Sequence, residues 1–509
     1  MKKLLCIFLL FITVCAHSQN VTSFIKPSSG KKAPKELTQE KLSSLADKSV
    51  VQIETAQKIV YDVEPFKLSN LGNVTGTGFV YNFKGEKVVI TNAHVAKSFY
   101  SKSVIRKPSL TGEIPKKYDA ELLFITPDFD LAMLRVKDKT FFDGLEALEL
   151  GETPSAGESV MTIGFPAGTS SGSAVNLYKT FTIMNRATFT QYSFAGTGAE
   201  ILALQLTGAI MPGISGGPVL NSRGQVIGVS FQHAKAYEQQ GYAIPSLYLD
   251  AFLRDCADGK NEGPFTMGVW GASKGPANYD YREMLGVPKE DGGALLFNVT
   301  EATSIFHSGI RNGDIITKID SYQLLPNHNI IIPGLGEFPF AAYLAKFIAG
   351  DSVTFEYYSR SNPGKAMKSK VVLREKIDIT NGSKKDEDLP FITNGGIIFA
   401  EHWSFSYKQN DTAKRKKIVI STSYGNNLPK TYWNYTLLTV NNDKITDIES
   451  LKKAFEKNAD FYLLEIESND FNGVYIAIDN RGDELKNFNK QTMDKFEIPK
   501  EAFLPHLLP

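Results

Sequence analysis

The feature that most constrains the fold of this chain is a succession of short apolar segments in its first half. Gly, Pro, Asn and Asp separate the segments, and no ten-residue helical period interrupts them before Ser246. Short strands divided by turn residues are typical of all-β barrels and sandwiches. The sequence therefore predicts a first unit built from strands, whose main apolar segments are Ser49–Ile53, Gly78–Tyr81, Lys87–Ile90, Leu131–Val136, Val160–Ile163, Ile201–Leu206 and Gln225–Val229.

The length of the chain predicts further units. A chain of 509 residues suggests three domains at about 100–200 residues each, with two or four as alternatives. The charged run Ser383–Asp388 indicates a linker between the second and third units. Both later units mix short strands with a helical stretch, such as Ile448–Phe455, which is an α+β pattern. We therefore expect a first unit at 46–260, a second at 263–379, a linker at 380–389 and a third unit at 390–509.

Composition excludes several classes of protein. Apolar residues make up 42% of the chain and charged residues 22%, as in ordinary globular proteins, so wholesale disorder, collagen and a polytopic membrane protein are excluded. The 56 Lys and Arg nearly balance the 55 Asp and Glu, and the net charge is +1. Because no global basic field exists, we expect no nucleic-acid partner.

The N-terminus predicts export. Lys2 and Lys3 precede an apolar run, Leu4–Val14, and small residues at 16 and 18 follow it, as in a cleaved signal peptide spanning 1–18. A retained anchor is the weaker interpretation, because the run is about half of the ~20 residues that a membrane span needs. A lipoprotein signal at Cys15 is a second alternative, although Val14 stands where a small residue is expected.

Cleavage of this signal would leave a mature chain that begins at Gln19. Cys6 and Cys15 would leave with the signal, so only Cys256 would remain and no internal disulfide could form. Residues 19–45 show no apolar period and are predicted to be an N-terminal linker.

Three short motifs of the first unit carry residues with chemical potential. His94 follows an apolar segment, Asp130 opens another, and Ser215 lies in the glycine-rich turn Pro212–Pro218. A side chain at a strand end reaches a cleft while the strand fixes its backbone. Glycines allow conformations in which successive N–H groups point at one spot, as an oxyanion requires.

The three residue types together favour nucleophilic catalysis. A serine hydroxyl is inert at neutral pH unless an imidazole takes its proton, and a buried carboxylate orients and compensates that imidazole. Asp128 is an alternative to Asp130, because it lies two residues earlier on the same side of an extended chain. Taken singly, each residue also has a structural interpretation, as a packed residue, a strand cap or a turn.

At these motifs the chain resembles the trypsin-like serine proteases of the HtrA/Deg type. The matching stretches are Thr91–Val95 around the histidine, Asp130–Ala132 around the aspartate, Gly213–Pro218 around the serine, and Gly241–Pro245 as the strand beside the specificity pocket. The resemblance implies a mainly β fold, with a chymotrypsin-like double β-barrel protease domain followed by two α+β PDZ-like domains. It also implies a catalytic triad of His94, Asp130 and Ser215, and an oxyanion hole formed by the N–H groups of Gly213 and Ser215.

The later units resemble PDZ domains. Thr266–Val269 is similar to a carboxylate-binding loop, Ser308–Ile316 to the following turn and strand, and Leu437–Ile445 to the divergent second PDZ-like domain of plant-type Deg proteases. The resemblance implies that Met267, Gly268 and Val269 bind peptide C-termini. The insert Leu324–Pro339 is long enough to fold over that groove, which would make the unit an assembly surface instead.

The resemblance also implies a function and a location. It predicts an ATP-independent endopeptidase of a bacterial periplasm or cell envelope that degrades unfolded or misfolded proteins. Such a protein would need no cofactor, and no spacing of Cys and His suggests a metal site. The family generally forms trimers or multiples of them, so a homo-oligomer is expected, with Tyr61 and Phe66 in the corresponding region.

The approach to the serine departs from the family pattern. Thr207, Met211 and Ile214 replace polar residues there, which brings the hydrogen bonding of this loop into question. The alternative function is therefore a proteolytically inactive chaperone or binding scaffold with PDZ domains. The presence of all three triad residues favours the enzyme.

Overall fold

The computed structural model describes most of the chain. The described residues are 35–61, 64–109, 115–167, 176–191, 200–208, 210–233, 240–259, 273–275, 277–289, 291–297, 299, 303–332, 336–373, 391–394, 397–404, 415–423, 435–457, 461–467 and 474–479. The predicted signal peptide, the linker 380–389 and the predicted peptide-binding residues Met267, Gly268 and Val269 lie outside them, as do the side chains of Tyr61 and Phe66.

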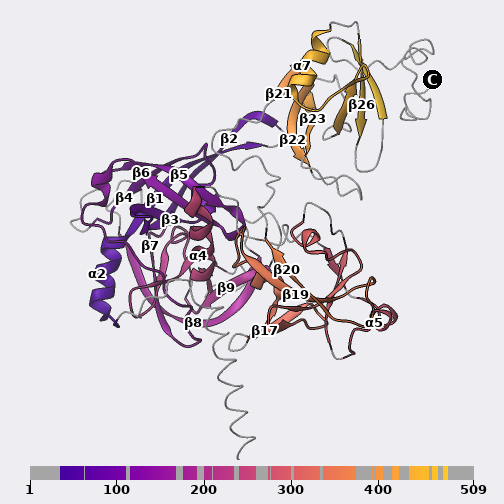
Figure 1. Cartoon of the computed structure of the whole chain (residues 1–509). Coiled ribbons are helices and arrows are strands. Elements are labelled where there is room, and N and C mark those ends of the chain that lie inside the picture. Colours follow the sequence, from indigo (N-terminus) through magenta and orange to yellow (C-terminus); the bar gives the residue numbers. More distant parts are fainter. Residues whose placement is uncertain are drawn as a thin grey trace, which may run out of the picture. The chain divides into compact units, whose positions relative to one another are not determined.

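The chain divides into two compact units. Unit 1 comprises Met1–Gln57 and Leu71–Ile377, and unit 2 comprises Lys58–Asn70 and Asp378–Pro509. The strands predicted from the apolar segments are present, and most of unit 1 consists of two closed β-barrels (Figure 1). The prediction of a double-barrel, mainly β fold is confirmed.

The first barrel closes in the order β1-β2-β3-β6-β5-β4. Antiparallel pairing sets Thr91 of β3 opposite Ala132 of β6. Residues just after β3 and just before β6 therefore meet at the same end of the barrel, and these are the segments that carry His94 and Asp130. The strands are β1 Val50–Tyr61, β2 Glu64–Phe83, β3 Glu86–Thr91, β4 Lys102–Arg106, β5 Tyr118–Thr126 and β6 Leu131–Val136.

The second barrel closes in the order β10-β11-β12-β9-β8-β7. Ser215 precedes β10, which lies between β7 and β11 through the pairs Val219 with Thr162 and Pro218 with Val229. The backbone N–H of Thr77 in β2 donates to the Ser215 carbonyl at 2.8 Å, so the serine turn is joined to the first barrel. The strands are β7 Ser159–Gly164, β8 Tyr178–Gln191, β9 Glu200–Leu206, β10 Pro218–Leu220, β11 Val226–His233 and β12 Gly241–Pro245.

Helices close the ends of the double barrel. The prediction of an N-terminal linker over residues 19–45 is wrong at its C-terminal end, because the helix α2 (Gln39–Ser49) begins inside it. The Thr38 hydroxyl caps the helix. Leu42 and Ala46 are buried at helical spacing, and the charged residues before and after them hide this period in the sequence. The other helices of this region are α3 Ala93–Ala96, α4 Ser246–Asp255, η1 Pro127–Phe129, η2 Lys139–Phe142 and η3 Cys256–Asp258.

The rest of unit 1 is a sheet in the order β13-β14-β15-β19-β20, with β16 added to β15 and a separate hairpin of β17 and β18. Its helix α6 packs on the second barrel, where the Tyr248 hydroxyl donates to Ala342 O at 3.2 Å. The arrangement is consistent with a PDZ-like domain. Its elements are β13 Ser273–Gly275, α5 Tyr279–Leu285, β14 Ala294–Phe297, η4 Phe306–Ser308, β15 Ile315–Ile319, β16 Tyr322–Gln323, β17 Asn329–Ile332, β18 Gly336–Pro339, α6 Phe340–Leu344, β19 Ser352–Tyr358 and β20 Met367–Val372.

Unit 2 has a sheet in the order β21-β22-β23-β24-β26-β27, with β25 added to β24. The predicted helix after Ile445 is present as α7, whose buried residues Ile448, Leu451 and Ala454 pack in the core of this unit. Its elements are β21 Phe391–Asn394, β22 Ile397–Ser404, β23 Arg415–Ser423, β24 Thr436–Val440, β25 Asp443–Lys444, α7 Ile448–Glu456, β26 Phe461–Glu467 and β27 Val474–Asp479.

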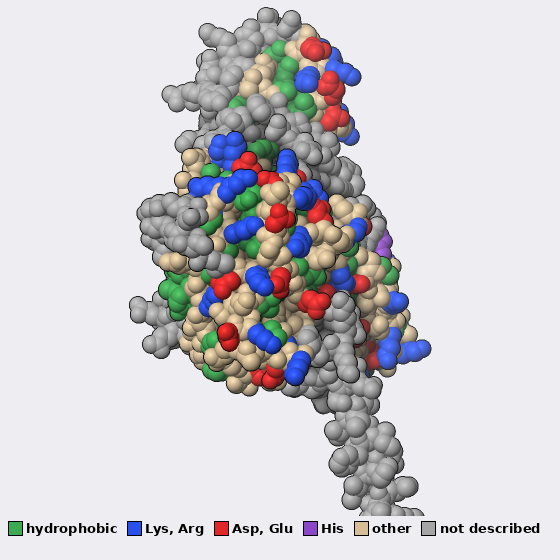
Figure 2. All heavy atoms as spheres, turned by 90° about the vertical axis from the view of Figure 1, so that its left-hand side faces the viewer, with side chains coloured by type: hydrophobic (Ala, Val, Ile, Leu, Met, Phe, Trp, Pro, Cys, Tyr) green, Lys and Arg blue, Asp and Glu red, His purple; other side chains and the backbone are tan. Residues whose placement is uncertain are grey.

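Charges of both signs cover the visible face of unit 1. Figure 2 shows Lys, Arg, Asp and Glu side chains interspersed over the described part of that face. Ion pairs join some of the described charges of unit 1, for example Lys48 with Glu146 at 2.9 Å and Arg135 with Glu86 at 3.2 Å. Among the described residues, no helix is long and apolar enough to cross a lipid bilayer.

Candidate active site

His94 and Asp130 form the best-defined pair of the site. The Asp130 carboxylate contacts His94 twice, with Oδ2 at 2.7 Å from Nδ1 of the ring and Oδ1 accepting the backbone N–H at 2.8 Å. The Asp130 side chain is 3% exposed and that of His94 is 30% exposed. The carboxylate is therefore shielded from water while the ring faces an accessible space, and the two bonds hold the ring in one orientation.

The backbone of Asp130 is held in an unusual conformation. Its φ is +54°, in the left-handed region that residues other than glycine seldom adopt. Asn92 stabilises this turn, because its amide Nδ2 donates to Asp130 O at 2.9 Å. Phe129 beside it stacks on Tyr248 at a ring distance of 4.4 Å. Asp128, the alternative carboxylate, lies in η1 and is also buried.

Gln57 adds a further support that the sequence did not reveal. Its side-chain Nε2 donates to the carbonyl oxygens of His94 at 2.5 Å and Val95 at 3.3 Å. Gln57 thus fixes the backbone at and just after the histidine, while Asn92 joins the segment before the histidine to the backbone of Asp130. Asn92 could have been identified from the sequence, because it lies two residues before His94. No sequence feature near Gln57 indicates that it belongs to the site.

Burial and charge act on His94 in opposite directions. Burial by itself would lower the pKa of the imidazole, and the positive charge of Lys97 acts in the same direction. The charge and the hydrogen bond of Asp130 together outweigh them, so the pKa of His94 lies above its ordinary value. The ring is therefore a stronger base than a free imidazole.

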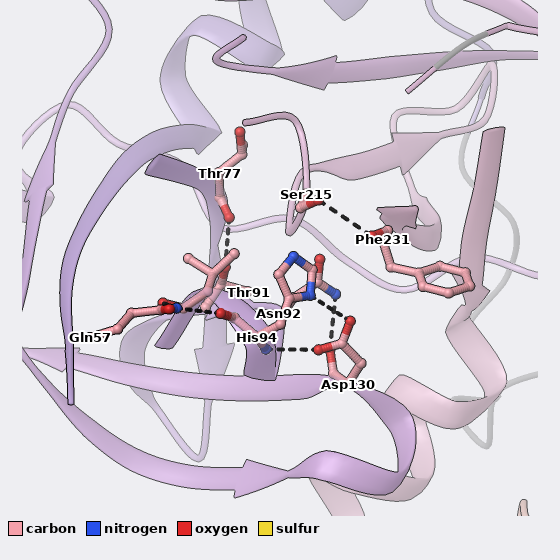
Figure 3. A network of polar contacts seen from close by, with 9 residues as sticks. Gln57, Thr77, Thr91, Asn92, His94, Asp130, Ser215 and Phe231 are labelled. Atoms are coloured by element: carbon pink, nitrogen blue, oxygen red, sulfur yellow. Dashed lines mark hydrogen bonds and ion pairs between the residues drawn. The ribbon is translucent and has the colours of Figure 1, made fainter. Parts of the chain in front are cut away.

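Ser215 lies on the far side of the imidazole from Asp130. Figure 3 shows the His94 ring between Asp130 and Ser215 in a close view of the site. The Ser215 hydroxyl donates to Phe231 O at 3.3 Å, which is a long hydrogen bond. The structure thus gathers all three residues that the sequence singled out at the junction of the two barrels.

The glycines around Ser215 are required by close packing. A Cβ atom on Gly213 would lie 2.4 Å from Phe165 O, and one on Gly216 would lie 2.1 Å from Thr77 O. Both residues also have positive φ, +94° and +88°. Only glycine fits at these two positions, which explains the glycine spacing of the motif.

Two backbone N–H groups of the serine turn take no part in the hydrogen bonds that hold this turn in place. In a trans peptide the N–H and the C=O of the preceding residue point in opposite directions, so fixing one fixes the other. Among the described residues, the N–H groups of Gly213 and Ser215 donate to no acceptor. The three carbonyls of the loop are all held, with Pro212 O accepting from Ala167 N at 2.6 Å, Gly213 O from Thr77 Oγ1 at 2.7 Å and Ile214 O from Gly217 N at 2.9 Å.

Two of the three residues that depart from the family pattern, Thr207 and Ile214, have a clear place in the packing. Thr207 turns to β8, where its hydroxyl is 3.1 Å from that of Thr182. Ile214 is 1% exposed and packs in the interior. Within the described part of the chain, no cluster of three His, Cys, Asp or Glu side chains is placed to hold a metal ion.

Fold and site together define a trypsin-like serine peptidase domain, and residues 76–229 match the family of trypsin-like peptidase domains. The chain is similar to Do-like and HtrA proteases, in agreement with the resemblance seen in the sequence. It is 29% identical to "Protease Do-like 2, chloroplastic" of Arabidopsis thaliana over 64% of this chain and 50% of the relative. It is 27% identical to "Serine protease HTRA1" of Xenopus tropicalis over 55% of this chain and 58% of the relative.

The chain spans about half the length of these curated relatives. A solved structure, "HtrA-type protease AlgW with tripeptide", aligns with 68% of this chain and 100% of that chain, at 18% identity and a TM-score of 0.47.

Proposed function

We propose that the chain is a serine endopeptidase in which Ser215 is the nucleophile, His94 the general base and acid, and Asp130 the residue that orients His94. The observation that carries this proposal is the buried Asp130 carboxylate 2.7 Å from His94 Nδ1, with Ser215 on the other side of the ring. The double hydrogen bond leaves Nε2 as the ring atom that faces the serine. No other described residue is needed for a proton relay of this kind.

The proposed reaction proceeds in two halves. Ser215 Oγ attacks the scissile carbonyl carbon while His94 takes the hydroxyl proton, and the resulting oxyanion accepts from the N–H groups of Gly213 and Ser215. His94 then gives the proton to the leaving amine, and an acyl-enzyme remains. Water repeats the sequence and releases the acid. One oxyanion donor typically contributes about 3–4 kcal/mol to the transition state.

Cleavage of unfolded casein by the mature chain tests this proposal. We expect hydrolysis and labelling by a fluorophosphonate probe, and Ser215→Ala should abolish both, a loss of at least about 10³-fold. The matched control is Ser222→Ala. Ser222 lies in the turn after β10, and its hydroxyl donates to the Glu36 carboxylate. The activity of this variant should equal that of the wild type. A wild-type chain that neither cleaves casein nor takes the probe would instead favour the inactive binding scaffold.

We also propose that the substrates are unfolded or misfolded proteins of a bacterial periplasm or cell envelope. The support for export is the N-terminal pattern of Lys2, Lys3 and an apolar run, and the substrate class is what the resemblance to HtrA/Deg proteases implies. Mass spectrometry of the protein recovered from cells tests the export. An N-terminus at Gln19 supports it, and an intact N-terminus on all copies contradicts it.

Assembly into a homo-oligomer, and binding of peptide C-termini at Met267, Gly268 and Val269, complete the proposal. Light scattering of the mature chain at micromolar concentration tests the first, because a stable monomer would exclude it. Titration with peptides that end in a free or an amidated apolar residue tests the second. Equal affinity for both forms would exclude carboxylate binding and favour a role of this domain in assembly.

A further inference from the structure

Thr77 occupies the junction of the two barrels. It lies in β2 between Gly76 and Gly78 and its side chain is fully buried. Its hydroxyl makes two hydrogen bonds to the second barrel, with Gly213 O at 2.7 Å and Phe165 N at 2.9 Å. A backbone N–H can only donate, so Phe165 supplies one proton and the Thr77 hydroxyl gives its own proton to Gly213 O.

The carbonyl that Thr77 holds belongs to the peptide between the two candidate oxyanion donors. The Gly213–Ile214 peptide joins the peptide that carries the Gly213 N–H to the one that carries the Ser215 N–H. Its orientation therefore sets the angle between the two donors. On its other side, Ile214 N donates to Met211 O at 3.1 Å within the same turn.

This central peptide needs an external restraint. Gly213 has a φ of +94° and lacks a side chain, so rotation about its backbone bonds meets little steric resistance. The apolar side chains of Met211 and Ile214 offer no hydrogen bond that would hold the loop. Among the described residues, the Thr77 hydroxyl is the side-chain group that hydrogen-bonds to a carbonyl between 211 and 215.

We infer that Thr77 is a positioning residue of the oxyanion-binding loop, which keeps the Gly213 and Ser215 N–H groups convergent without touching the substrate. The inference rests on the proposed function. It also explains how the loop keeps its shape although the side chains of Met211 and Ile214 offer no hydrogen bond. Electrostatic stabilisation depends on donors that are oriented before the reaction, so loosening them should slow the chemical step more than it weakens substrate binding.

The test compares Thr77→Ser with Thr77→Ala, which differ by one hydroxyl, in saturation kinetics on fluorescently labelled casein. We expect Thr77→Ala to lower kcat by roughly 10–100-fold with KM changed by less than about 3-fold, and Thr77→Ser to restore kcat to within about 3-fold of the wild type. Thr77→Val should behave like Thr77→Ala. If Thr77→Val does not fold, the Ser and Ala pair alone decides.

The control for lost stability is Thr55→Val. Thr55 is a buried threonine of the same barrel whose hydroxyl pairs with that of Ser103 at 2.9 Å, away from the loop. Each variant is assayed well below its own melting temperature, and Thr55→Val should keep kcat within about 2-fold of the wild type.

An active wild type with equal kcat for Thr77→Ser and Thr77→Ala contradicts the inference alone. A loss for Thr77→Ala that Thr55→Val matches contradicts it as well, because the effect would then follow stability. Failure of the wild type itself contradicts the proposed function, and Thr77 loses its role with it.

Discussion

At the scale of single residues, the charge around His94 decides when the candidate base can work. Only the neutral imidazole accepts a proton from Ser215, so activity should rise with pH as His94 loses its proton. Burial and Lys97 lower the pKa of His94, but the charge and hydrogen bond of Asp130 raise it by more. The pH at which activity is half-maximal should therefore lie above about 6.5, the ordinary pKa of histidine.

Lys97 gives a direct test of this balance. Its positive charge lowers the pKa of His94, so Lys97→Gln should raise that pKa and move the midpoint of the rate profile to higher pH. Activity should fall below the midpoint and stay unchanged well above it. The measurement is kcat/KM between about pH 5 and pH 9.

The control for this test is Lys97→Arg. Burial lowers the pKa of Lys97, whereas arginine stays charged throughout the range, so the midpoint of Lys97→Arg should not move upward. A shift of the Lys97→Gln midpoint to lower pH, or no shift at all, would show that Lys97 does not act on His94 through its charge.

At the scale of elements, the serine turn depends on a close approach of two backbones. Gly216 and Gly85 have nearly the same conformation, with φ of +88° and +86°. Their surroundings differ, because a Cβ on Gly216 would lie 2.1 Å from Thr77 O, whereas one on Gly85 would have no atom within 4 Å. The pair therefore separates backbone strain from steric overlap.

Alanine at each of the two positions tests the packing of the turn. Gly85→Ala should lower the free energy of unfolding by about 1–2 kcal/mol, the cost of a left-handed conformation. Gly216→Ala carries the same strain and an overlap with main-chain atoms, so a loss above about 4 kcal/mol is expected, together with loss of activity. Urea unfolding measures both. Equal losses would mean that the turn is not packed against β2 as described.

At the scale of the whole molecule, unit 1 combines the double barrel and the first PDZ-like sheet. Tyr248 of α4 connects them, since its hydroxyl accepts from Leu202 N of the second barrel at 3.2 Å and donates to Ala342 O of α6 at 3.2 Å. Arg254 adds a hydrogen bond to Lys346 O at 2.9 Å and an ion pair with Asp351 at 3.3 Å.

Tyr248→Phe tests this connection. The variant leaves a buried N–H and a buried carbonyl without the hydroxyl, so the free energy of unfolding should fall by about 1–3 kcal/mol. Tyr178→Phe is the matched control, because Tyr178 is 40% exposed on β8 and should change stability by less than about 0.5 kcal/mol. Urea unfolding of the mature chain measures both variants. If the two curves coincide, α6 does not dock on the barrel through this hydroxyl.

The sequence by itself indicated most strands of the double barrel and the three candidate catalytic residues. Local patterns were enough for both, because a strand is set by its apolar residues and turns, and the motifs around His94, Asp130 and Ser215 are each contained in a few neighbouring positions. The helix α2 was missed, since charged residues precede Leu42 and follow Ala46 and serines lie between them, so its apolar face is narrow.

Only the tertiary structure decided which residues support the site. The Thr77 hydroxyl meets Gly213 O across 136 positions of sequence, and the Asn92 amide meets Asp130 O across 38. A bond from a side chain to a distant main-chain atom leaves no periodicity in the sequence, because its acceptor is a carbonyl that every residue possesses. Its existence depends on how the two barrels close and pack, which local patterns do not determine.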